Sequence, residues 1–155
     1  MWRYPKLLIF LIFIFLNSCG YQRIYQSTEL NYNITKIEFK SDQKINKSIK
    51  RIIENLNKNV DGKKIKVVVN SQRNKTIITK DKKGDPNLFS LSINVEMYLY
   101  DEEILLSKKT FVKENKYSND DNKFNLNIYE QNLEKNLNEK IIEEIFRYLN
   151  QIKLW

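Results

Sequence analysis

The chain has 155 residues, a formal net charge of +8, no histidine, three glycines and one cysteine, Cys19. This length suits a single domain, and the lack of histidine excludes histidine-based general base catalysis and most zinc or copper sites. Three glycines are too few for a glycine-rich phosphate loop, so we expect no cofactor, no metal site, no catalytic residues and no enzymatic activity.

The N-terminal segment has the parts of an export signal. The first six residues include two basic ones and no acidic one, and all ten residues from Leu7 to Leu16 are apolar. A basic stretch, a short apolar run and a small residue before a break are typical of a secretory signal. The apolar run is about half of the roughly 20 residues that a membrane-spanning helix needs. We therefore predict that residues 1–18 are a cleaved signal peptide.

The stretch Leu16-Asn17-Ser18-Cys19 resembles the bacterial lipobox. That resemblance implies acylation of the Cys19 thiol, cleavage before Cys19 and a stable anchor, because several acyl chains on one residue hold a membrane where one chain does not. Gly20 rather than Asp favours the outer membrane, by analogy with Gram-negative bacteria. The alternative is an ordinary cleaved signal followed by a free thiol, which is unusual in an exported protein.

Residues 19–33 are predicted to be a lipidated tether, irregular over 26–33, and residues 34–155 to form the folded domain. Residues 34–40 alternate apolar and charged side chains, as in a half-buried strand. Ser41 or Asp42 is a candidate N-cap for a helix whose apolar residues recur every three or four positions from Ile45 to Leu56. Asp61-Gly62 ends this segment with a turn.

Three strands are predicted next. The second covers residues 64–70 and extends over 75–80 past an irregularity at 71–74, and residues 81–86 form a turn. The third covers residues 88–100, where every odd position from Leu91 to Leu99 is apolar. After a short turn, residues 104–117 form a fourth strand antiparallel to the third.

A long helix is predicted to close the chain. It follows the polar loop 118–123, in which Asp121 or Asn122 is the candidate N-cap. Apolar residues mark one face of this helix: Leu126, Tyr129, Leu133, Leu137, Ile141, Ile145, Tyr148, Leu149 and Ile152. A coiled coil is the rival, but the spacing is mostly four rather than alternating three and four. The helix should therefore lie across the sheet.

The predicted order β-α-β-β-β-α gives an α+β fold, a two-layer sandwich in which two helices cover one face of a four-stranded sheet. Only the connection through the first helix is long enough for a crossover, so the first and second strands are the pair that can be parallel. The other face of the sheet should be half polar.

The lipobox, the sequence Cys19-Gly20-Tyr21-Gln22 and this order of elements together resemble the LptE family of lipopolysaccharide-assembly lipoproteins. The resemblance covers nearly the whole chain. It implies an outer-membrane, lipid-anchored protein that faces the periplasm or sits in the lumen of an LptD-like β-barrel. Its partners would be that barrel and lipopolysaccharide, and it would help to assemble lipopolysaccharide at the cell surface. No lipopolysaccharide-binding residue is transferred from the family.

Five basic residues around the turn at Gly84 are candidates for lipopolysaccharide contact, because fixed cations pair with phosphate oxygens. They are Arg73, Lys75, Lys80, Lys82 and Lys83. The simpler interpretation, a solvated hairpin tip in a lysine-rich protein, is slightly favoured. Nucleic acid does not suit an exported lipoprotein, despite the basic balance.

Two other functions are compatible with an anchored domain. One is an accessory subunit of a lipid or solute transport system. The other is a carboxylate-dependent hydrolase, against which the absence of histidine and of a paired-acid motif both count.

Overall fold

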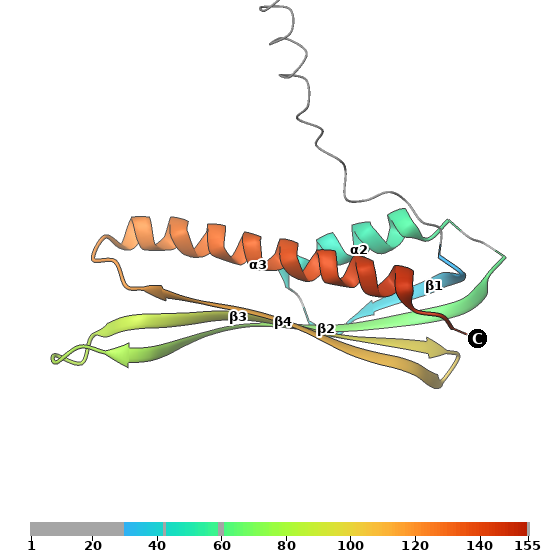
Figure 1. Ribbon diagram of the computed structural model, residues 1–155, viewed down its shortest axis with the longest axis horizontal. Helices are drawn as coiled ribbons and strands as arrows, with labels where there is room; N and C mark the ends of the chain where they lie inside the picture. The colour runs from blue at the N-terminus through green and yellow to red at the C-terminus, as the bar shows by residue number, and fades with distance from the viewer. Residues whose placement is uncertain (1–29, 42, 59–60, 155) are drawn as a thin grey trace, which may run out of the picture.

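The computed structural model describes residues 30–41, 43–58 and 61–154, so Cys19, the predicted signal and most of the predicted tether lie outside the described residues. The elements run from a short strand to a long helix (Figure 1). In order they are β1 (Tyr32–Phe39), α2 (Lys44–Leu56), β2 (Lys63–Lys80), β3 (Pro86–Asp101), β4 (Ile104–Ser118) and α3 (Lys123–Gln151).

The strands form one sheet in the order β1-β2-β3-β4, with β1 parallel to β2 and the other neighbours antiparallel. Both helices lie on the same face of the sheet, and the β2–β3 hairpin projects beyond the start of α3 (Figure 1). The predicted α+β sandwich, its order of elements and its parallel pair are confirmed.

The alternation in β3 divides the sheet into a buried and an open face. Leu91, Ile93, Val95, Met97 and Leu99 are all buried, since successive side chains of a strand point to opposite faces. These side chains face the helices and form the middle of the core. Their neighbours of even number point to the open face and are mostly half-buried.

The two helices complete the core on the buried face of the sheet. Ile49 and Ile53 of α2, and Ile141 and Ile145 of α3, are fully buried. The Tyr32 hydroxyl donates a buried hydrogen bond of 3.0 Å to the carbonyl of Leu149, which joins the first strand to the last helix. Burial raises the pKa of the Tyr32 phenol well above its ordinary value. The long helix thus packs on the sheet, as predicted.

Several local predictions are wrong. β1 begins at Tyr32, inside the stretch predicted to be irregular, and β2 runs without a break through residues 71–74. The irregularities in the β2–β3 pairing lie instead between Ile77 and Lys80. Tyr129, predicted to be on the buried face of the last helix, is 50% exposed.

The predicted N-cap is confirmed for α3 but not for α2. Asn122 caps α3 and accepts hydrogen bonds from the backbone N–H groups of Phe124 and Asn125, at 3.1 and 3.2 Å. The N-cap of α2 is Gln43, without a side-chain hydrogen bond, rather than Ser41 or Asp42. Asp42 lies outside the described residues, and Ser41 bonds to β2.

The open face of the sheet is held by ion pairs between neighbouring strands. Lys66 lies 3.1 Å from Glu38, and Lys108 lies 3.4 Å from Glu96. Hydrogen bonds from Lys36 and Lys66 lower the pKa of Glu38. Of the two helices among the described residues, neither has the length and apolar content to span a membrane.

Candidate functional site

The five predicted basic residues do not form one cluster. Arg73 and Lys75 lie on the helix-facing side of β2, under the N-terminal half of α3. Lys80 ends β2, and Lys82 and Lys83 lie in the turn beyond it. The structure therefore separates two cations bound by α3 from three cations at the hairpin tip.

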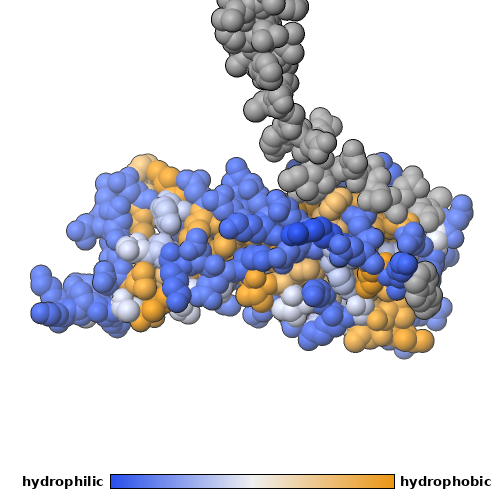
Figure 2. All heavy atoms as spheres, viewed as in Figure 1, coloured by the Kyte–Doolittle hydropathy of each residue, from blue (hydrophilic) through white to orange (hydrophobic). Residues whose placement is uncertain are grey.

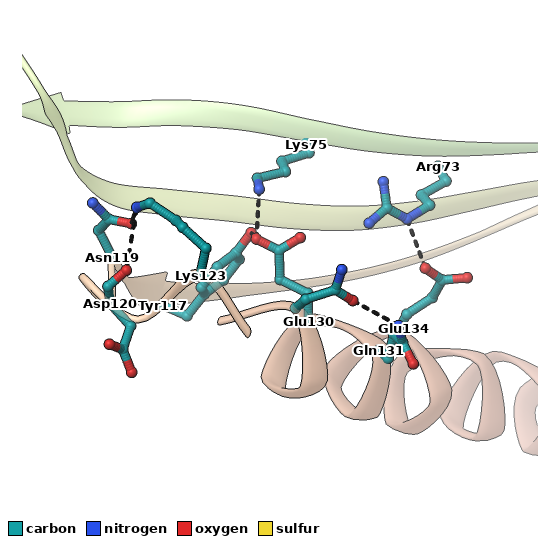
Figure 3. Close-up of polar contacts among 10 residues, drawn as sticks. Arg73, Lys75, Tyr117, Asn119, Asp120, Lys123, Glu130, Gln131 and Glu134 are labelled. Atoms are coloured by element: carbon teal, nitrogen blue, oxygen red, sulfur yellow. Dashed lines mark hydrogen bonds and ion pairs between the residues drawn. The ribbon is translucent and has the colours of Figure 1, made fainter. Parts of the chain in front are cut away.

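Arg73 and Lys75 pair with two carboxylates of α3 (Figure 3). The Arg73 Nε donates to Glu134 Oε2 at 2.7 Å, and the Lys75 Nζ donates to Glu130 Oε1 at 2.5 Å. The Tyr117 hydroxyl also donates to Glu130 Oε1, at 2.8 Å. These contacts join the N-terminal half of α3 to β2 and β4.

Glu130 accepts hydrogen bonds from two residues of this network, Lys75 and Tyr117. Burial alone would raise its pKa, but hydrogen bonds from Lys75 and Tyr117 outweigh burial and hold the pKa below its ordinary value. Burial, and then the hydrogen bond to Glu130, raise the pKa of the Tyr117 phenol. Glu130 is therefore ionised and Tyr117 protonated at neutral pH, which is what their mutual hydrogen bond requires.

Replacing Glu130 with Gln is expected to lower the free energy of unfolding by about 2 kcal/mol at pH 7, since a hydrogen bond to a charged group is worth more than a neutral one. Because the folded-state pKa of Glu130 is depressed, its contribution is present above the unfolded pKa of about 4.3 and is lost as pH falls through the folded pKa. Urea unfolding of both proteins between pH 3 and 7 measures the difference.

The matched control is Glu139→Gln, because Glu139 is exposed on the same helix. It should change stability by less than about 0.5 kcal/mol across the same range. A difference between wild type and Glu130→Gln that does not shrink on acidification would contradict the ion-pair assignment.

The hairpin tip is a defined turn that displays its lysines. Asp81 Oδ1 accepts hydrogen bonds from the backbone N–H groups of Lys83 and Asp85, both at 2.8 Å. Gly84 has a φ of 90°, which side-chain-bearing residues rarely adopt. Lys80, Lys82 and Lys83 are exposed, and none has an ion pair within the described part of the chain. Figure 2 shows this end as a hydrophilic projection.

Two hollows border these cations. A groove of about 600 Å³ lies between β2, the start of α2 and the start of α3, and includes Arg73, Lys75, Lys44 and Lys123. A wider cleft of about 1040 Å³ lies between the hairpin tip and the loop before α3. Its titratable residues are Asp81, Lys83, Asp85, Tyr117, Asp120, Asp121 and Tyr129. The wider cleft is therefore acidic, and the groove is basic.

No group of three or more potential metal ligands occurs among the residues that the structure describes. The groove offers instead a row of cations beside two carboxylates, which suits binding of negatively charged groups.

Sequence reasoning missed the two carboxylates, although a spacing signal for them exists. Arg73 and Lys75 are two residues apart on a strand, which separates them by about 6.7 Å. Glu130 and Glu134 are four residues apart on a helix, a rise of about 6 Å. The two spacings match once the helix lies along the strand, but that placement comes from tertiary packing.

Comparison with known proteins gives a likeness of fold. No family model and no curated protein sequence matches this chain. Among solved structures, an uncharacterized lipoprotein B from Nitrosomonas europaea has a TM-score of 0.59 at 18% identity, covering 81% of this chain and 86% of that one. A minor lipoprotein from Acinetobacter baumannii has a TM-score of 0.61 at 12% identity, covering 79% of this chain and 93% of that one. The chain therefore shares its fold with bacterial lipoproteins.

Proposed function

We propose that this chain is a non-enzymatic outer-membrane lipoprotein that forms a complex with an LptD-like β-barrel and takes part in assembling lipopolysaccharide at the cell surface. The observation that carries the proposal is the combination of Cys19, at the end of a lipobox-like stretch that follows a short apolar run, with a fold shared with bacterial lipoproteins. The acyl chains on Cys19 hold the domain at the membrane, and the two-layer α+β domain supplies the surface that meets the barrel.

The exposed hairpin tip supports a contact with lipopolysaccharide. Lys80, Lys82 and Lys83 are exposed and free of ion pairs among the described residues, so binding a phosphate there breaks no internal contact. Arg73 and Lys75 are less suited, because a phosphate would have to displace Glu134 and Glu130. Within the five predicted cations, the tip lysines are therefore the favoured contacts.

The partner is tested by purifying the acylated chain from outer membranes in mild detergent, without cross-linking. We expect a large β-barrel to co-purify in a constant ratio. A chain that fractionates with the outer membrane but brings no barrel would overturn the proposed complex. An inner-membrane transport complex in its place would support the alternative, an accessory subunit of a lipid or solute transporter.

Reversing the charge of Lys82 and Lys83 to Glu is expected to weaken binding of purified lipopolysaccharide about tenfold, since two exposed cation–phosphate contacts together contribute about 1.4 kcal/mol. Binding is measured by displacement of a fluorescent lipopolysaccharide from the purified chain. The matched control reverses Lys47 and Arg51 on α2, which are exposed and have no ion pair among the described residues. Equal weakening by both double variants would remove the tip from the proposal.

A further inference from the structure

β2 is much longer than the strand beside it. β1 ends at Phe39, which pairs with Val69, and the backbone N–H of Lys40 donates to the Val69 carbonyl at 2.9 Å. β2 continues to Lys80. From residue 72 onward, β2 therefore has a strand neighbour on its β3 side only, within the residues that the structure describes.

A serine completes the last rung of the β1–β2 ladder. The Ser41 hydroxyl accepts a hydrogen bond from the Ser71 backbone N–H at 3.1 Å and donates to the Ser71 carbonyl at 2.7 Å. The backbone groups of Ser71 thus point away from β3. Alternation along an antiparallel strand directs the N–H and C=O groups of Arg73, Lys75 and Ile77 the same way. Beyond Ser41, these backbone donors and acceptors have no strand partner among the described residues.

The groove of about 600 Å³ runs beside this open edge. Its lining includes Arg73 and Lys75 of β2, the start of α3, and Gln43 and Lys44 at the start of α2, but no residue of β3 or β4. The side chains of Arg73 and Lys75 face α3 (Figure 3). A strand added at the edge would thus direct every second side chain into the groove between β2 and α3.

The groove is positively charged. Its four cations outnumber its two carboxylates, which leaves a formal charge of +2. The cations are Lys44, Arg73, Lys75 and Lys123, and the carboxylates are Glu130 and Glu134. Lys44 is 81% exposed and only 3.9 Å from its nearest carboxylate, Glu134. Lys123 bonds to Asn119 Oδ1 and the Asp120 carbonyl. These two lysines are the cations available to an incoming acid.

We propose that the open edge of β2 at residues 73–77 receives an extended, acidic segment of a partner protein as a fifth strand. Main-chain hydrogen bonds to β2 supply the affinity, and alternate carboxylates of that segment meet Lys44 and Lys123 in the groove. This mode, in which a peptide adds a strand beside a helix, is a common form of protein recognition. The inference goes beyond the proposed function and does not depend on it.

Other occupants fit these observations less well. A second copy would bring the same basic residues into contact, and like charges facing each other across a ladder are destabilising. Residues 20–29 of this chain contain one basic and one acidic residue, so they lack the run of alternate carboxylates that an acidic strand needs. A lipid phosphate would use the cations and leave the backbone groups of the edge without a role.

The test uses the purified full chain in neutral detergent and the synthetic peptide Thr-Glu-Val-Glu-Val-Glu-Thr. Amide exchange measured by NMR should show new protection at Arg73, Lys75 and Ile77 on peptide binding. Asn74 and Thr76 already point to β3, so their protection should not change. In the added strand, every second backbone N–H of the peptide points to β2. N-methylation of those amides should abolish binding, and N-methylation of the remaining amides should leave binding unchanged.

Matched variants test the charge. Lys44→Glu should weaken peptide binding about tenfold, whereas Lys47→Glu, the same change away from the groove on the same helix, should alter it by less than about twofold. Binding without protection at the three edge amides, or equal binding of both methylated peptides, would overturn the proposal. If inorganic phosphate displaced the peptide while the amides of the β2 edge kept their protection, the groove would bind anions rather than a strand. That result would also overturn the proposal.

Discussion

Replacing Leu99 with Ala is expected to lower the free energy of unfolding by about 3 kcal/mol, one of the two largest effects that we predict for a single substitution. Leu99 is fully buried in β3, pairs with Val67 on one side and Ser107 on the other, and belongs to the core under the helices. The substitution removes apolar contacts and leaves a cavity that two rigid neighbouring strands cannot close. Chemical denaturation of the purified protein measures the loss.

Leu105→Ala is the matched control for this prediction. Leu105 lies in β4 close to the β3–β4 turn and is 49% exposed, so the same truncation should cost less than about 0.5 kcal/mol. If both variants lost similar stability, Leu99 would not lie in a close-packed core, and the register of β3 would be wrong by one residue.

Replacing Gly62 with Ala is expected to destabilise the protein by about 2 kcal/mol through overpacking. A Cβ at this position would lie 2.8 Å from the Cα of Tyr32, and backbone cannot move aside as a flexible side chain can. Tyr32 pairs with Lys63, so β1 must shift away from β2 to make room. Amide exchange should accelerate at Tyr32 and Ile34, and the unfolding midpoint should fall.

Gly84→Ala separates this steric effect from the general cost of replacing glycine. A Cβ at Gly84 meets nothing within 4 Å, and only the φ of +90° opposes it. We expect a loss of about 1 kcal/mol, with amide exchange in β1 unchanged. Faster exchange in β1 for both variants would contradict a local clash at Tyr32.

Backbone periodicity made the sheet predictable. The odd-numbered apolar residues from Leu91 to Leu99 fix which face of β3 is buried, because side chains alternate on any strand. The continuity of β2 was not predictable, since Ser71 and its neighbours are polar. Ser71 is buried by tertiary contacts, with a hydrogen bond of 2.7 Å to Asn46 Oδ1 and two bonds to Ser41.

The same distinction separates the two helix caps. Asn122 caps through atoms two and three residues away, so sequence alone was enough to name it as a candidate. Ser41 has the right chemistry for a cap but bonds to a strand 30 residues later. A helix cap can be predicted from the local sequence only when no distant group forms a hydrogen bond with the same side-chain oxygen.

The five predicted cations are separated because the side chains of β2 point to different faces of the sheet, not because the residues differ in chemistry. Lys75 and Lys80 are five residues apart, so they face opposite sides of a regular strand, and the shifts in register after Ile77 add a further change. The fate of Lys75 depends on Glu130, which lies 55 residues later. Composition identified the cations, but only the packing of α3 shows which of them are already neutralised.

The hydrogen bond between Tyr32 and Leu149 bears on when β1 can take its place during synthesis. β1 is held by a carbonyl in the last turn of α3, and Ile141, Ile145 and Leu149 of the same helix are buried in the core. During synthesis, therefore, Tyr32 cannot form this hydrogen bond until the last turn of α3 has left the ribosome.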